Sequence, residues 1–138
     1  MILTFSRDSF VESIINGTKI HTIRDDKPNR WKVGRKIHFW LGNPRNTKRK
    51  TKPYQFGVGE AVRVAKIRMY FDIAADWQVD EVFIDDISIK SIQELNDLAK
   101  NDGFDNWFQM KNWFDNEDKQ YFGKIIFWKN FELTEKIK

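Results

Sequence analysis

The sequence predicts a single α+β domain, residues 1–138, built as a small β-barrel with helices flanking it. Three observations lead to this prediction. A length of 138 residues lies in the common size range of one domain. Hydrophobic residues make up 41% of the chain, enough for one core, and 32% are charged, as a well-solvated surface requires. Short segments rich in β-branched and aromatic residues alternate with three amphipathic segments of helical period.

The start of the chain predicts a strand, a helix and a second strand. Residues 2–5 are apolar enough for a short strand, and Ser6 then offers an N-cap for a helix with one apolar face. Gly17 ends this helix, because glycine readily adopts the left-handed conformation that closes helices. Residues 19–24 are β-rich in composition and predict the second strand.

Strands dominate the middle of the chain. Residues 36–41 predict one strand, and the long stretch 54–71 predicts alternating strand material interrupted at 57–59. The alternation in that stretch places Val62, Val64 and Ile67 toward the core. At least one further strand is expected at 82–84 and 87–89.

The last third predicts two helices and a closing strand. Ser91 and Glu94 form the pattern of a capping box, which starts a short helix that ends near Asn101. Residues 104–114 predict a second helix with a strongly aromatic face, which could also dock a partner protein. Residues 121–133 predict the final β segment.

Composition excludes several classes of site. The chain has no Cys, so neither a disulfide nor a Cys-ligated zinc is possible. Its two His, His21 and His38, do not have the spacing of a metal-binding pair, and we expect no metal and no cofactor. We find neither a signal peptide nor an apolar run long enough to span a membrane, and expect a cytoplasmic protein without a membrane partner.

The positive charge is unevenly placed. The formal net charge is +4, with basic residues concentrated between Arg24 and Lys52, where only Asp25 and Asp26 oppose them. Such a cluster neutralises phosphates in nucleic-acid-binding proteins, and we therefore predict RNA as a partner, with Arg49 of the segment 45–52 as one contact. The alternative is a solvated loop that happens to be basic.

The candidate site lies in the strand that follows Gly17. Side chains alternate across a strand, so Thr22 and Arg24 should share one face, and Lys19, just before the strand, can swing toward Thr22. A Thr hydroxyl becomes a nucleophile only when a base takes its proton, and a lysine can act as that base if its pKa is depressed. Arg24 would supply a cationic field and could hold a carbonyl or a phosphate.

Each of these residues also has a structural interpretation. Lys and Thr on a strand are usually surface residues, and Asp25 more often caps a turn than contacts a ligand. His21, beside apolar neighbours, is more often a hydrogen-bonded structural histidine than a base. We nevertheless predict ligand contacts by Lys19, His21, Arg24 and Asp25.

A family resemblance supports a functional interpretation. The segment Gly17-x-Lys19-x-x-Thr22-Ile23-Arg24-Asp25, followed by Trp31-Lys32-Val33-Gly34, resembles the ASCH domain, a β-barrel family related to the RNA-binding PUA domains. A later segment, Leu98-Ala99-x-x-Asp102-Gly103-Phe104, is similar to a second ASCH feature, an acidic residue just before an aromatic helix. The resemblance implies a PUA-like barrel that binds RNA or a nucleotide in a Lys- and Arg-lined cleft.

The same resemblance also implies a hydrolase as the alternative. Some bacterial ASCH proteins are amidohydrolases that deacetylate N4-acetylcytidine, a modified nucleoside, with a lysine, a threonine and a glutamate. The corresponding catalytic residues here are Lys19, Thr22 and Asp102, where Thr22 attacks the amide carbonyl, Lys19 assists its deprotonation and the carboxylate handles a proton. A metal-independent ribonuclease is a further possibility that the family leaves open.

Overall fold

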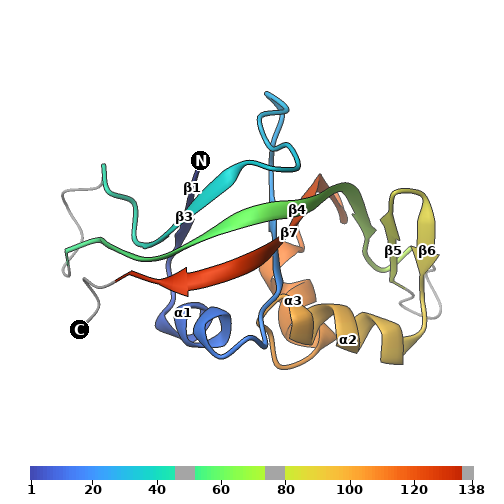
Figure 1. The fold of residues 1–138 in the computed structure, drawn as a ribbon. Helices are drawn as coiled ribbons and strands as arrows, with labels where there is room; N and C mark the ends of the chain where they lie inside the picture. Colours follow the sequence, from blue (N-terminus) through green and yellow to red (C-terminus); the bar gives the residue numbers. More distant parts are fainter. Residues whose placement is uncertain (46–51, 74–79, 135–138) are drawn as a thin grey trace.

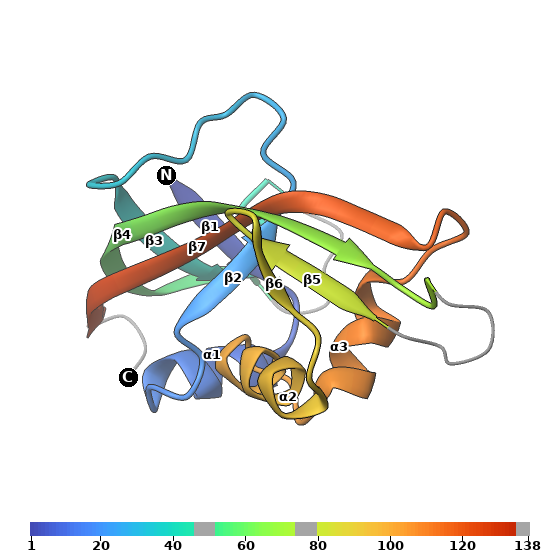
Figure 2. The ribbon, with the colours of Figure 1, turned by 90° about the vertical axis from the view of Figure 1, so that its right-hand side faces the viewer.

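The computed structural model describes residues 1–45, 52–73 and 80–134 (Figure 1). In these residues seven strands form one mixed sheet, and three helices lie together under one face of it (Figure 2). The α+β class is therefore confirmed. In chain order the elements are β1 (Ile2–Phe5), α1 (Asp8–Ile15), β2 (His21–Arg24), β3 (Lys36–Leu41), β4 (Tyr54–Tyr70), β5 (Glu81–Ile84), β6 (Ile87–Ile89), α2 (Ile92–Asn101), α3 (Trp107–Phe114) and β7 (Gln120–Leu133).

The antiparallel pair of β4 and β7 forms the centre of the sheet. β7 follows β4 along one edge, while β3 and β5 share the other edge, β3 along the first half and β5 at the end. The predicted interruption at 57–59 is wrong, because β4 runs through it as one strand of 17 residues. Gly57 is required there for packing: a Cβ at this position would lie 2.3 Å from the ring of Phe131.

Irregularities in the β4–β7 ladder overturn one predicted orientation. The register shifts between Val58 and Glu60 and again between Ala61 and Arg63. Each shift changes which side chains face the core, because side chains alternate across a strand. Val62, predicted to face the core, is 42% exposed, whereas Ala61 and Ala65 are buried. Ile67 is buried and Val64 packs against the core, as predicted.

The expected closure into a β-barrel is wrong for the described residues. β1 pairs only with β3, in parallel, and β2 pairs only with β7, so the two outer edges that would have to meet carry no backbone ladder between them. A side chain bridges this gap instead: Arg24 Nη2 of β2 donates a hydrogen bond to the Thr4 carbonyl oxygen of β1, at 2.6 Å. The gap between β1 and β2 is where the candidate site lies.

Side chains cap α2 and α3 but not α1. At α2 the Ser91 hydroxyl accepts a hydrogen bond from the Glu94 N–H at 3.1 Å, which confirms the predicted cap. The Glu94 carboxylate reaches back to the Ser91 hydroxyl, which donates to it at 2.9 Å, in place of the Ser91 backbone N–H of a full capping box. The predicted cap at Ser6 is wrong: α1 begins after Arg7, whose side chain makes no capping bond. No helix in the described ranges is long and apolar enough to cross a membrane.

A charge cluster ties α3 to the sheet. Lys111 Nζ lies 2.7 Å from Asp72 Oδ1 and 3.1 Å from Asp80 Oδ1, and the Trp107 indole N–H donates to Asp80 at 2.8 Å. The hydrogen bond from Lys111 lowers the pKa of Asp72 below its ordinary value of 3.8. Ionised Asp72 thus stabilises the fold.

The pH dependence of stability tests this cluster. The contribution of Asp72 is fully present above its ordinary pKa of 3.8 and should be lost as the pH falls through its lower, folded-state pKa. Urea unfolding measured from about pH 6 to about pH 2 should therefore show a shallower loss of unfolding free energy in Asp72→Asn than in the unmodified chain. Asn tolerates the left-handed conformation, with a φ of 54°, that Asp72 adopts. Asp118→Asn, which removes an exposed carboxylate, is the control; an equal slope in all three proteins would contradict the prediction.

Candidate functional site

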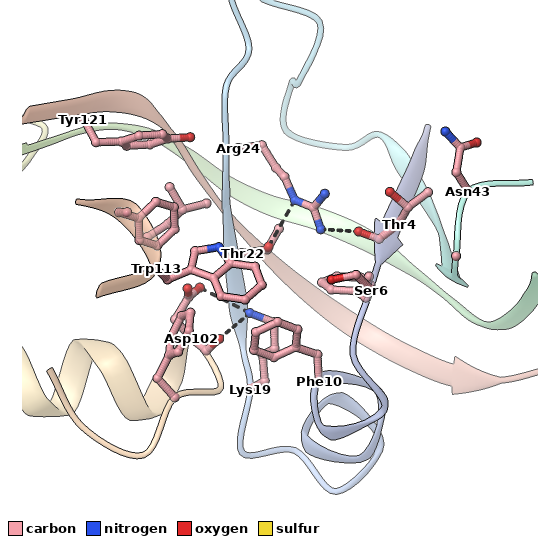
Figure 3. A pocket seen from close by; sticks show the side chains of 15 residues that line it. Thr4, Ser6, Phe10, Lys19, Thr22, Arg24, Asn43, Asp102, Trp113 and Tyr121 are labelled. Atoms are coloured by element: carbon pink, nitrogen blue, oxygen red, sulfur yellow. Dashed lines mark hydrogen bonds and ion pairs between the residues drawn. The ribbon is translucent and has the colours of Figure 1, made fainter. Parts of the chain in front are cut away.

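A cavity of about 600 Å³ opens at the gap between β1 and β2 (Figure 3). Its volume is within the range of small-molecule sites, roughly 300–1,000 Å³. One side is aromatic, formed chiefly by side chains of α1, α3 and β7. The other side is polar, with Lys19, Thr22, Arg24 and Asp102 converging from β2, the turn before it and the end of α2.

Lys19 occupies the buried end of the polar side. The turn at Gly17, with a φ of 87°, closes α1 and brings Lys19 under the sheet, where it is 2% exposed. Its Nζ donates to the His21 carbonyl oxygen at 2.8 Å, to the Asp102 carbonyl oxygen, and to Asp102 Oδ1 at 3.3 Å. Each of the three ammonium protons thus has a protein acceptor, and this arrangement suits the charged form. The ammonium also lies 5.1 Å from the ring centre of Phe10.

Burial and the neighbouring carboxylate act on Lys19 in opposite directions. Burial lowers the pKa of Lys19 below its ordinary value of 10.5, and the charge of Asp102 with its hydrogen bond offsets part of that effect. The predicted contact between Lys19 and Thr22 is replaced by these bonds, although both residues line the cavity.

Asp102 connects Lys19 to a buried histidine. Asp102 is the C-cap of α2, and its carboxylate oxygen Oδ1 also lies 2.9 Å from His21 Nδ1. The His21 ring packs edge-on against Phe127 of β7, with ring centres 4.9 Å apart. Oδ2 of Asp102 has no hydrogen-bond partner in the described part of the chain, and no buried polar side-chain atom there is left without one. Oδ2 is therefore the unused acceptor of this carboxylate, on a side chain that is 3% exposed.

Arg24 is fixed across the gap by contacts at both ends of its guanidinium. Its Nε donates to Thr22 Oγ1 at 3.3 Å, its Nη2 bonds to the Thr4 carbonyl oxygen, and its plane lies 4.9 Å from the ring centre of Phe5. The bond between Arg24 and Thr22 confirms that the two side chains share one face of β2.

The structure places the predicted site residues in three groups. Lys19, Thr22, Arg24 and Asp102 line the same cavity. His21 is buried behind that group, and the carboxylate of Asp25 is 57% exposed; neither lines the cavity. Arg49 and most of the segment 45–52 lie outside the described residues, so this predicted RNA contact stays a prediction.

Further lining residues were missed because their elements are distant in sequence. Figure 3 shows Thr4 and Ser6 from β1 and its following turn, Asn43 after β3, Trp113 from α3 and Tyr121 from β7 around the same space. Only the aromatic pattern of α3 gave a signal in the sequence, and that signal does not separate a ligand wall from a docking surface. Burial raises the pKa of the Tyr121 hydroxyl, which therefore stays protonated and able to donate.

Gly103 is a test of how tightly the Lys19 environment is packed. Its φ is 93°, and an added Cβ would lie 2.9 Å from Lys19 Cδ and 3.1 Å from Phe10 Cδ1. Gly34 has a similar φ of 91° with no atom near the added Cβ. Gly34→Ala should therefore lose about 1 kcal/mol of unfolding free energy from backbone strain alone. Gly103→Ala should lose about 2–4 kcal/mol because steric overlap is added.

Urea denaturation of both glycine variants gives the measurement. Equal losses in the two variants would show that the packing around Lys19 yields freely and would contradict the tight arrangement described above.

Neither the grouping of possible metal ligands nor the comparisons with known proteins assign a function to this cavity. Among the described residues no three His, Cys, Asp or Glu side chains are grouped as metal ligands. Comparisons of the chain with protein-family models, with curated proteins and with solved structures found no match.

Proposed function

We propose that the cavity between β1 and β2 binds the base and sugar of a nucleoside or of one nucleotide in an RNA strand. The observation that carries the proposal is that a cavity of about 600 Å³ has an aromatic side and a polar side. Proteins that bind unpaired bases hold them by stacking on aromatic rings and by hydrogen bonds to the base edge. In this proposal the chain is an ASCH-type, PUA-like domain whose missing β1–β2 ladder leaves room for the ligand.

The aromatic side of the cavity suits the ring face of a base, and the polar side suits its hydrogen-bonding edge. Trp113 is 49% exposed and offers a ring surface for stacking, while its other contacts, edge-on to Phe10 and Phe104, hold it in place. On the polar side, Oδ2 of Asp102 is an acceptor and Thr22 can donate its hydroxyl proton. A base with both donor and acceptor groups on its edge matches this set.

Stacking on Trp113 is tested by a pair of variants on the same helix. Trp113→Ala should weaken the binding of nucleosides and of a short single-stranded RNA about tenfold or more, because one stacked ring contributes about 1–3 kcal/mol. Phe108 of α3 is 69% exposed and does not line the cavity, so Phe108→Ala should bind as the unmodified chain does. Titration calorimetry measures both.

Two results of this titration would contradict the proposed function or the proposed place of binding. Absence of saturable binding of all four nucleosides and of the RNA by the unmodified chain would refute the proposed function. Equal weakening of binding by both variants would show that the ligand binds outside the cavity.

A second candidate is hydrolysis of an amide on a nucleobase, as the family resemblance implies. The observation in its favour is that Lys19, Thr22 and Asp102 line one cavity. Since the three protons of Lys19 are directed to protein acceptors, we assign proton transfer to Asp102 and electrostatic support of that carboxylate to Lys19. Thr22 Oγ would attack the acyl carbon, its proton would pass through Asp102 to the leaving nitrogen, and water would release the acyl group. The ribonuclease alternative gains nothing from His21, which lies behind the cavity.

Hydrolysis of N4-acetylcytidine separates this candidate from simple binding. If Thr22 is the nucleophile, Thr22→Val should lower kcat about a hundredfold or more, and Thr22→Ser should keep measurable activity. Thr18→Val, which removes an exposed hydroxyl outside the cavity, is the control. Failure of the unmodified chain to release cytidine would eliminate the hydrolase, whereas equal activity of Thr22→Val would eliminate Thr22.

A further inference from the structure

The charged groups that line the cavity do not balance. Lys19 and Asp102 form an ion pair in which both side chains are nearly inaccessible to solvent, at 2% and 3%, so their charges offset each other. Arg24 also lines the cavity, and no carboxylate of the described residues lies within ion-pair distance of it. Asp25, its neighbour in the chain, is turned to solvent and lies 3.9 Å from Lys27. One positive charge in the cavity is therefore left without a counter-charge.

The guanidinium of Arg24 is also oriented for a ligand. Two of its three nitrogens are held by protein acceptors, Nε by Thr22 and Nη2 by the Thr4 carbonyl oxygen. Nη1 has no acceptor among the described residues. The ring of Phe5, 4.9 Å away, supports the plane of the group. A fixed guanidinium with unused N–H donors is suited to an oxyanion, which it can bind through more than one hydrogen bond.

A hydroxyl donor faces the same position. Thr22 Oγ1 accepts from Arg24, so the proton of Thr22 is directed elsewhere and stays available to the base. The hydroxyl of Tyr121 points toward Arg24 from the opposite side of the cavity (Figure 3). Carbonyl groups of a ligand would satisfy these donors but would leave the charge of Arg24 uncompensated in a poorly solvated site, which is costly.

We propose that Arg24, together with the Tyr121 hydroxyl, binds a phosphate group, so that the ligand of this cavity is a nucleotide and not a neutral nucleoside. The inference rests on the proposed function, because it is the nucleobase-binding role that makes the oxyanion a phosphate. It also adds a constraint, since the phosphate contact is assigned to residues that line the cavity.

The test compares each nucleoside with its 5′- and 3′-monophosphates by titration calorimetry. For the unmodified chain at least one monophosphate should bind about tenfold or more tightly than the nucleoside, as expected for charge-assisted hydrogen bonds. In Arg24→Gln this ratio should fall to about one. Arg24→Lys, which keeps the charge and loses the planar group, should retain only part of the preference.

Arg68→Gln is the matched control. Like Arg24, Arg68 lies over a phenylalanine ring, in this case that of Phe83. It bonds to Asp86 and does not line the cavity. This variant should keep the full preference for the monophosphate. Because Arg24 also bridges β1 and β2, its loss could unfold the chain. The salt dependence of the unmodified chain therefore gives a second measurement: raising the salt should weaken monophosphate binding and leave nucleoside binding nearly unchanged.

The results separate the inference from the proposed function. Equal affinity for nucleosides and monophosphates, or a preference that survives in folded Arg24→Gln, would overturn the phosphate site and leave nucleobase binding in place. Absence of binding by every nucleoside and monophosphate would overturn both.

Discussion

The buried ion pair between Lys19 and Asp102 is the interaction on which the site depends. It joins the turn before β2 to the end of α2, two segments far apart in the chain, through two hydrogen bonds from the ammonium to Asp102, and a third bond holds the ammonium to the His21 carbonyl oxygen. Two of the acceptors are backbone carbonyl oxygens, so the bonds fix the path of the chain as well as the side chains. Breaking such a pair by removing one partner typically costs about 3–5 kcal/mol, because the other charge stays buried. The same pair neutralises Lys19 and leaves Arg24 as the cation that faces the ligand space.

Local patterns in the sequence predicted the elements better than their assembly. The strand at 36–41 and the Ser91 cap of α2 depend on neighbouring residues, and the structure confirms both. The register shifts in β4 depend on the partner strand, and no alternation within 54–71 reveals them. The prediction of a closed barrel was wrong for a related reason. Whether β1 and β2 pair depends on both strands together, and the sequence of either strand alone does not show that they stay apart.

The residues of the candidate site also divide into those that one local segment predicts and those that only the tertiary fold brings to the cavity. Lys19, Thr22 and Arg24 stand close together in one segment, so strand alternation was enough to place Thr22 and Arg24 on one face. Asp102 was added by resemblance alone, and its contact with Lys19 fits that assignment. The residues Ser6, Asn43 and Tyr121 reach the cavity only through the tertiary fold. For His21 the sequence offered a hydrogen-bonded structural histidine as one interpretation, but it did not indicate the partner, Asp102, which lies in another element.

The long ladder between β4 and β7 also has a consequence for how the protein folds. It pairs residues that are distant in sequence, such as Gly57 with Leu133 and Tyr70 with Gln120, and β2 joins the sheet only through β7. Chains dominated by such non-local pairings close long loops before they gain contacts, and they fold slowly for their size. Until β7 docks, β2 has no strand to pair with, although the Lys19 bonds still hold the turn before it. The part of the ligand space that Thr22 and Arg24 supply is therefore coupled to the docking of the last strand.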